Sequence, residues 1–303
     1  MGKPGRAPSL EVEVRPPWPY RLPRSSGGDG VLRSPRPGIA CRLLHVDGEP
    51  VVVHAWEAGK ARVVFRASGA DRRRLELAIE RMRFASGVDM DLSEFHHRFK
   101  GDPLIGPGIV KKPWHRPRRR AWPWEALAWA VTSQLIEAFR AAAIQRRIVW
   151  RWGPRREMED GMLRDVPGAT LIAGRAPAEL AAMDLAPSRA LSMIRCAKEV
   201  ATGRVDPSSP GSDRRLLRIS GIGPWTVQCL GAFGRGDLDS LPAGDLAYVK
   251  LVGRLAGLGR RATVPEIEEF FKPYEPFRAL AGSFALVAWH KTIAKGPKLR
   301  MAA

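Results

Sequence analysis

The most informative stretch of the chain reads Leu216-Leu217-Arg218-Ile219-Ser220-Gly221-Ile222-Gly223-Pro224-Trp225-Thr226-Val227. Gly221 and Gly223 permit backbone conformations that are closed to other residues, so a turn here can bring its N–H groups close to a phosphate. Pro224 suits the first turn of a following helix, where its missing N–H is not needed. The leucines before the glycines and the apolar residues after Pro224 therefore predict a helix, a tight hairpin and a second helix.

An aspartate follows the hairpin in the segment Leu241-Pro242-Ala243-Gly244-Asp245-Leu246. Asp245 stands directly before an apolar pattern at helical spacing, which is the N-cap position of a new helix. Many aspartates cap helices and do nothing else, so this role alone explains the residue. Asp237 and Asp239 lie nearer the hairpin in sequence, but they precede Pro242 and begin no helix, which makes them weaker candidates for chemistry.

The charge of the chain favours a polyanionic partner. Its 303 residues include 50 Lys plus Arg against 31 Asp plus Glu, a formal net charge of +19. In a protein with a hydrophobic core, such an excess indicates nucleic acid first. The alternative is a compositional bias toward Arg and Ala that raises the charge without any binding role.

The cysteines and the hydropathy pattern exclude several classes of protein. Cys41, Cys196 and Cys229 form no CxxC pair, so we expect no zinc site, iron-sulfur cluster or disulfide framework. No run approaches the roughly 18 apolar residues of a membrane span, and the N-terminus lacks the apolar core of a signal peptide. We expect a cytoplasmic protein, associated with the nucleoid if it is bacterial.

The N-terminal third carries strand patterns followed by one helix. Alternating or apolar runs predict strands at 10–14, 41–46, 51–56 and 61–67, the last three forming an antiparallel meander. Residues 71–84 have helical spacing. After about Leu92 every segment shows helical periodicity, so the expected fold class is α+β: an N-terminal antiparallel sheet with a helix at 1–110, then an all-α body at 111–303.

Two features of the helical part carry further predictions. Lys111 to Arg120 holds six basic residues and no acid, which is typical of phosphate contacts or of a solvated hinge. A long helical pattern, 124–152, places Gln134 and Leu135 within its apolar face. An amide there needs partners, so Gln134 is either a buried hydrogen-bonding residue or faces a site.

The run from Ile219 to Asp245 resembles the signature of the helix-hairpin-helix DNA glycosylase superfamily, in which a Gly-Ile-Gly hairpin precedes a Pro-x-x-Asp element. Within it the sequence is most similar to the DNA-3-methyladenine glycosylase II family. Supporting segments are Trp124-Glu125-Ala126-Leu127, Ser133-Gln134-Leu135, Leu185-Ala186-Pro187-Ser188-Arg189-Ala190 and Tyr274-Glu275-Pro276-Phe277-Arg278. The resemblance extends over residues 10–295 and implies a helix-hairpin-helix glycosylase body after an α+β domain.

The resemblance implies roles for individual residues. Asp245 matches the catalytic aspartate, and Leu135 matches the side chain that wedges into the duplex where the target base leaves. Trp225 occupies the place of the nucleophilic lysine of lyase-competent relatives, which implies a monofunctional enzyme that uses water. The candidate DNA-binding residues are Gly221, Ile222, Gly223, Pro224, Thr226, Gln134 and Leu135.

The base pocket is where the sequence departs from the family. Ser133-Gln134 replaces the usual Gly-Gln, and Cys229 stands where some relatives have an aromatic residue. Trp225 is the best-placed ring to stack on a cationic alkylated purine, and core packing at helical spacing is the alternative. Trp289 lies off the apolar face of the last helix and is the third candidate pocket residue.

The predicted function is hydrolytic excision of damaged, alkylated bases from duplex DNA by a monomer in base-excision repair. We expect no required cofactor or metal, and a monovalent cation at the hairpin fits the resemblance. The rival readings are a non-catalytic DNA-binding protein on the same scaffold and a lyase-type glycosylase for oxidised bases. An RNA-binding protein is disfavoured because no ribonucleoprotein aromatic motif or Gly-x-x-Gly loop of that kind is present.

Overall fold

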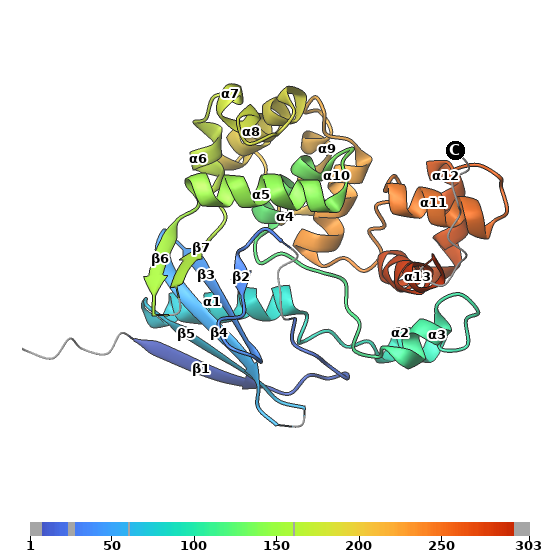
Figure 1. Ribbon diagram of the computed structural model, residues 1–303, viewed down its shortest axis with the longest axis horizontal. Helices are drawn as coiled ribbons and strands as arrows, with labels where there is room; N and C mark the ends of the chain where they lie inside the picture. The colour runs from blue at the N-terminus through green and yellow to red at the C-terminus, as the bar shows by residue number, and fades with distance from the viewer. Residues whose placement is uncertain (1–7, 24–27, 60, 160, 294–303) are drawn as a thin grey trace, which may run out of the picture.

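The computed structural model describes residues 8–23, 28–59, 61–159 and 161–293. Within these residues, three large hydrophobic cores organise the chain, which we call the sheet core, the central core and the C-terminal core. Figure 1 shows the sheet at the lower left, helices α4 to α10 above it, and α11 to α13 to the right. The predicted α+β class is confirmed.

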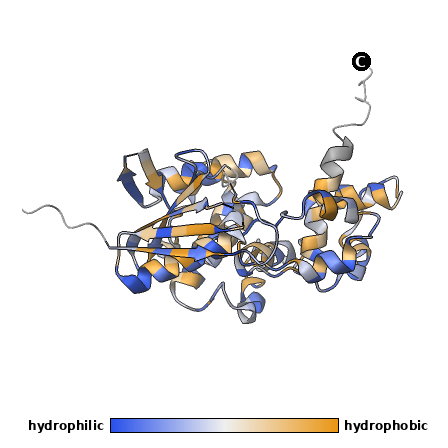
Figure 2. Cartoon of the chain, turned by 90° about the horizontal axis from the view of Figure 1, so that it is seen from below, coloured by the Kyte–Doolittle hydropathy of each residue, from blue (hydrophilic) through white to orange (hydrophobic). Residues whose placement is uncertain are grey.

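The sheet core is an antiparallel sheet with one helix packed on it. The strand order is β1-β5-β4-β3-β2, with bounds β1 (Ser9–Val14), β2 (Leu32–Arg33), β3 (Ile39–Val46), β4 (Glu49–Glu57) and β5 (Val63–Ser68). The predicted meander is confirmed as β3-β4-β5, and Figure 2 shows hydrophobic residues along these strands. Helix α1 (Arg72–Ser86) begins at the N-cap Asp71 and buries Leu75, Ile79 and Met82 in this core.

The C-terminal core joins the two ends of the helical part. It contains α2 (Ser93–Phe99), α3 (Gly106–Lys111), α11 (Leu246–Leu255), α12 (Val264–Phe271) and α13 (Arg278–Ile293). Phe95 and Phe284, nearly 190 residues apart in sequence, stack with ring centroids 5.5 Å apart. A domain division at residue 110 stays a prediction, but α2 and α3 pack with the C-terminal helices. No described helix is both long enough and apolar enough to cross a bilayer.

The central core corrects two sequence predictions. Its elements are α4 (Pro123–Ser133), α5 (Ala138–Trp152), β6 (Arg155–Met158), β7 (Gly161–Arg164), α6 (Ala169–Ala173), α7 (Pro177–Ala181), α8 (Pro187–Ala201), α9 (Asp213–Leu216), α10 (Pro224–Cys229) and a π-helical turn (Leu230–Arg235). The single helix predicted at 124–152 is wrong, because the chain turns at 134–137. The all-α prediction is also wrong, because β6 and β7 pair as a short, highly charged hairpin with little apolar alternation.

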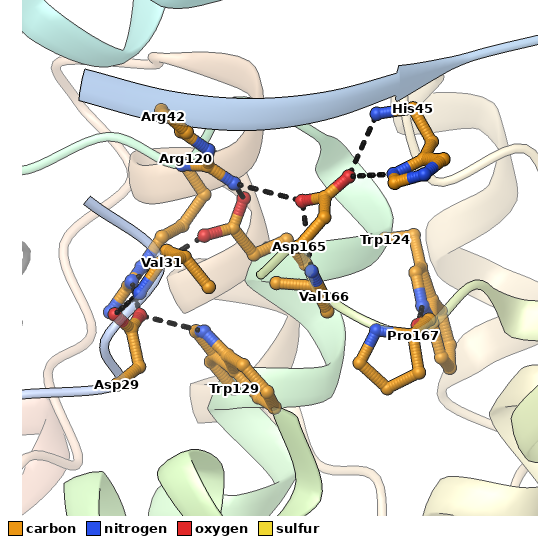
Figure 3. Close-up of polar contacts among 11 residues, drawn as sticks. Asp29, Val31, Arg42, His45, Arg120, Trp124, Trp129, Asp165, Val166 and Pro167 are labelled. Atoms are coloured by element: carbon orange, nitrogen blue, oxygen red, sulfur yellow. Dashed lines mark hydrogen bonds and ion pairs between the residues drawn. The ribbon is translucent and has the colours of Figure 1, made fainter. Parts of the chain in front are cut away.

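A buried ionic cluster joins the sheet to α4 (Figure 3). The Arg42 guanidinium of β3 lies 2.7 Å from Glu125 of α4 and 3.8 Å from Asp165. Burial alone lowers the pKa of Arg42, yet these two carboxylates raise it above its ordinary value. Asp29 accepts hydrogen bonds from Arg120 and from the Trp129 indole of α4. The cluster therefore fixes the orientation of α4, whose far end carries Gln134 and Leu135.

Candidate functional site

The predicted hairpin is present between α9 and α10. Gly221 has a φ of +84°, and a Cβ there would overlap the Ser192 hydroxyl, so only glycine fits. Gly223 has a φ of −113° and a ψ of −179°, and a Cβ there would meet no atom within 4 Å. The expectation of a special backbone conformation is thus right for Gly221 and wrong for Gly223. The open space at Gly223 instead leaves its backbone accessible to a ligand.

The turn exposes backbone donors and hides two predicted contact residues. Within the described residues, no acceptor is found for the N–H groups of Gly221 and Gly223. The side chains of Ile222 and Thr226 are buried, with residue exposures of 5% and 1%. Any contact of these two residues with DNA therefore has to be made through the backbone. Pro224 begins α10, as expected.

Gln134 links the turn after α4 to the hairpin. Its Nε2 donates hydrogen bonds to the Gly221 carbonyl at 2.8 Å and to the Thr226 hydroxyl at 2.9 Å. The structure combines the two sequence-based alternatives, because the amide is hydrogen-bonded, yet it is only half-buried and its acceptors belong to the candidate site. Because both acceptors belong to the hairpin, these bonds hold the turn against the hairpin.

Leu135 is fully exposed at the surface beside this linkage. Its φ of +58° lies in the left-handed region, which is unfavourable for a leucine. Such a conformation persists only where the surroundings hold it. Arg189 of α8 supplies part of that support, because it donates to the carbonyls of Thr132 and Gln134 at 3.0 and 3.1 Å.

Asp245 lies at the N-cap of α11, as the sequence predicts. Its carboxylate accepts a hydrogen bond from the Ala247 N–H at 2.8 Å and is only partly buried. Gly244, the residue before Asp245, lies against Trp225 of α10, because a Cβ on Gly244 would be 3.6 Å from the Trp225 ring. The hairpin helix and the candidate carboxylate are therefore neighbours.

The loop before Asp245 is held by an ion pair. Arg278 of α13 donates to Asp239 from its backbone N–H and from Nε, both at 3.0 Å. Asp237 in turn accepts the Asp239 N–H at 2.9 Å. These contacts occupy Asp239 in fixing the loop, and they give Arg278 in the segment 274–278 a positioning role.

The three predicted pocket residues differ in their surroundings. Trp225 is partly exposed, and its indole N–H is buried without an acceptor among the described residues. Cys229 is 3% exposed, and burial, followed by the charge of Asp245, raises its pKa well above the usual value. It stays a neutral thiol beneath the site. The Trp289 side chain lies outside the described residues.

Three arginines of the basic run 111–120 contact other parts of the protein, while phosphate contact by the run stays a prediction. Arg116 donates to the backbone carbonyls of Gly87 and Pro19, each at 2.8 Å. Arg119 donates to the Gly236 carbonyl, and Arg120 pairs with Asp29. These three arginines bind groups from distant parts of the chain, so this part of the run is not a solvated hinge.

Comparisons with known proteins agree with this arrangement. No family model matches the sequence. The DNA-3-methyladenine glycosylase of Bacillus subtilis is 24% identical over 202 residues, which cover 64% of this chain and 66% of that protein. The 3-methyladenine DNA-glycosylase of Archaeoglobus fulgidus has a TM-score of 0.76 at 18% identity, covering 94% of this chain and 99% of that one.

The chain has the fold of the helix-hairpin-helix DNA glycosylase superfamily, and its sequence is similar to that of a DNA-3-methyladenine glycosylase. The fold itself does not separate mechanistic classes within this superfamily. The 8-oxoguanine glycosylase/lyase of Clostridium acetobutylicum also matches, with a TM-score of 0.66 at 13% identity over 86% of this chain and 97% of that one. The reaction therefore depends on the residues at the site.

The sequence analysis missed two residues of α8 that hold the Leu135 turn and the hairpin in place. Arg189 holds the Leu135 turn, and Ser192, one helical turn later on α8, donates to the Ser220 carbonyl of the hairpin at 2.8 Å. Their spacing of three residues on a predicted helix was the available signal, because such residues share a face. Nothing in the sequence indicated what that face would contact.

Proposed function

We propose that the protein is a monofunctional DNA glycosylase that rotates a damaged base out of the duplex and hydrolyses its bond to the sugar. The observation that carries this proposal is the contact between the Asp245 segment and the hairpin helix that presents Trp225. A partly exposed carboxylate thus lies beside a surface with free backbone N–H groups, and no lysine occupies position 225.

Each group has its own step in the proposed reaction. The N–H groups of Gly221 and Gly223 donate to DNA phosphates, and Leu135 fills the space that the rotated nucleotide leaves. As the glycosidic bond lengthens, the sugar gains oxocarbenium character, and the Asp245 carboxylate stabilises this charge and orients water. The exposed part of the Trp225 ring stacks on the base, most favourably when alkylation makes that base cationic.

Two rival functions fit these residues less well. A lyase needs an amine to form a Schiff base with the sugar, and Trp225 supplies none. A non-catalytic DNA-binding protein needs no accessible carboxylate, yet Asp245 keeps part of its surface exposed while it caps α11. Damaged duplex DNA as substrate, a monomeric state, a monovalent cation at the hairpin and a location in the cytoplasm or nucleoid are parts of the same proposal.

Purified protein is expected to release free alkylated purines from methylated duplex DNA and to leave an abasic site in each place. The measurement is chromatography of the released bases, with the same duplex before methylation as the control. The protein could instead bind DNA in a salt-sensitive manner and release no free base from alkylated, deaminated or oxidised duplexes. That result would support a non-catalytic DNA-binding protein.

Leu135→Ala is expected to lower kcat/KM for base release from duplex by about 10-fold to 100-fold. A methyl group cannot fill the space left in the base stack, so the rotated state loses the apolar contact of a buried leucine, worth about 1.5–3 kcal/mol. Release from single-stranded DNA, which has no such space, should change little. Phe139→Ala, which removes another exposed apolar side chain close by in sequence, is the matched control. An equal loss on single strands would contradict the wedge role.

Substitutions at the two hairpin glycines are expected to separate folding from binding. Gly221→Ala should lower the free energy of unfolding by about 1–2 kcal/mol, because it adds strain at positive φ and crowds Ser192. Gly223→Ala has open space and extended backbone, so its stability should change little while the Kd for duplex DNA rises. Chemical denaturation and fluorescence anisotropy measure the two effects. Unchanged DNA affinity in Gly223→Ala would remove Gly223 from the interface.

A further inference from the structure

A second site is suggested by a pocket of about 250 Å³ between the sheet body and the segment 114–120. Figure 1 shows this segment crossing from α3 to α4 beside α1. The pocket shares no lining residue with the hairpin, the Leu135 turn or the Asp245 loop. Its lining contains no acidic residue and six arginines: Arg21, Arg42, Arg116, Arg118, Arg119 and Arg120.

Among the described residues, only two of these six arginines have a carboxylate partner. Arg42 and Arg120 are neutralised by Glu125 and Asp29 (Figure 3). Arg119 instead bonds to a neutral backbone carbonyl of Gly236.

The remaining arginines of the lining also lack a carboxylate among their described contacts. Arg116 donates to backbone carbonyls. Arg21 lies over the Trp114 ring, 3.4 Å from its centroid, and Arg118 is exposed at the rim. The walls therefore carry a concentrated positive charge that neighbouring acids do not cancel.

Two of the lining arginines also have unused donors. The Nε atoms of Arg42 and Arg119 are buried without an acceptor among the described residues, and the Arg42 side chain is only 5% exposed. Buried donors in native proteins are nearly always bonded to protein, ordered water or a ligand. Planar guanidinium groups are suited to bidentate contacts with phosphate oxygens.

The pKa values of two groups at the pocket agree with a positive charge that no nearby acid neutralises. Burial lowers the pKa of His115, which also lines the pocket, to about 4, with Lys112 and Arg116 as further causes. Burial, followed by the charge of Arg116, lowers the pKa of Arg119 to about 10. An anion in this pocket would favour the charged forms of both groups and so raise their pKa values.

We propose that this arginine-lined pocket binds a phosphate group, either free or carried by a nucleic acid. The volume is below that of most pockets for whole cofactors, which start near roughly 300 Å³, and suits one phosphate or a diphosphate. The site is independent of the proposed glycosylase reaction, since no residue assigned to that reaction lines it.

The test is calorimetric titration of inorganic pyrophosphate into the full-length protein and into Arg119→Gln and Arg118→Gln. We expect at least about tenfold weaker binding in both variants, because each loses a charge-assisted hydrogen bond to the anion. Arg118→Gln is included because Arg118 is exposed, so this substitution should leave the fold intact. The matched control is Arg62→Gln, an exposed arginine of the same body that lies outside the pocket lining.

Two further measurements complete the test. The pKa of His115, followed by NMR, should rise when pyrophosphate binds. Competition with duplex DNA distinguishes the sources: displacement of pyrophosphate assigns the site to a DNA phosphate, and simultaneous binding assigns it to a free anion. Equal affinity in the wild type, Arg118→Gln, Arg119→Gln and Arg62→Gln, or an unmoved His115 pKa at saturation, would overturn the proposal.

Discussion

Asp245→Asn is expected to slow base release by about 10³-fold while the Kd for duplex DNA changes little. The carboxylate is the group proposed to stabilise the oxocarbenium ion, and loss of one such electrostatic contact costs about 10²–10³ in rate, with the orientation of water lost in addition. Asparagine caps helices about as well as aspartate, so the bond to the Ala247 N–H and the stability of α11 should persist. Single-turnover kinetics measure the effect directly.

The matched control for this variant is Asp237→Asn. Asp237 is exposed, lies in the same loop and accepts only a local backbone N–H in the described contacts. Its single-turnover rate should remain within about twofold of the wild type, because a surface change of this kind costs little. Full activity in Asp245→Asn, or an equal loss in Asp237→Asn, would remove Asp245 from its catalytic role.

Arg42→Met is expected to lower the free energy of unfolding by about 3 kcal/mol. The substitution leaves Glu125, whose side chain is fully buried, with Arg120 at 3.5 Å as its remaining cation. Removing one partner of a buried ion pair costs about 3–5 kcal/mol because the other charge stays desolvated. Chemical denaturation monitored by tryptophan fluorescence measures the change.

Two controls separate the buried charge from lost packing. Arg42→Met combined with Glu125→Leu should be less destabilised than Arg42→Met alone, because the unpaired charge is gone. Arg62→Met, which breaks an exposed pair with Glu13 at 3.4 Å, should change stability by less than about 1 kcal/mol. A double variant less stable than the single one would show that the cluster acts through shape rather than charge.

The fold was predictable where local pattern and tertiary packing agree. Strands β3 to β5 combine apolar runs with Gly-containing turns, and α1 has both a capping aspartate and an apolar face. The break between α4 and α5 was not predictable, because residues 134–137 continue a helical apolar pattern. The turn is stabilised by Gln134 and Arg189, whose partners lie on other elements.

The candidate site shows the same limit. Asp245 and the hairpin were predictable because capping and glycine chemistry depend on neighbouring residues. The position of Trp225 against Gly244 depends on how α10 meets the Asp245 loop, which no local pattern specifies. The internal partners of the run Lys111 to Arg120 could not be predicted for a related reason. A sequence shows the charges of these arginines but not the carbonyls and carboxylates that accept their hydrogen bonds.

The most direct test of the account uses an end-labelled duplex with a single alkylated purine, incubated with the wild-type protein. The account predicts release of the free base and an intact strand that breaks only after heating in alkali. It also predicts no protein–DNA adduct when borohydride is present, because no amine occupies position 225. Binding without base release, or a borohydride-trapped adduct with strand cleavage before heating, would contradict hydrolysis by a monofunctional glycosylase.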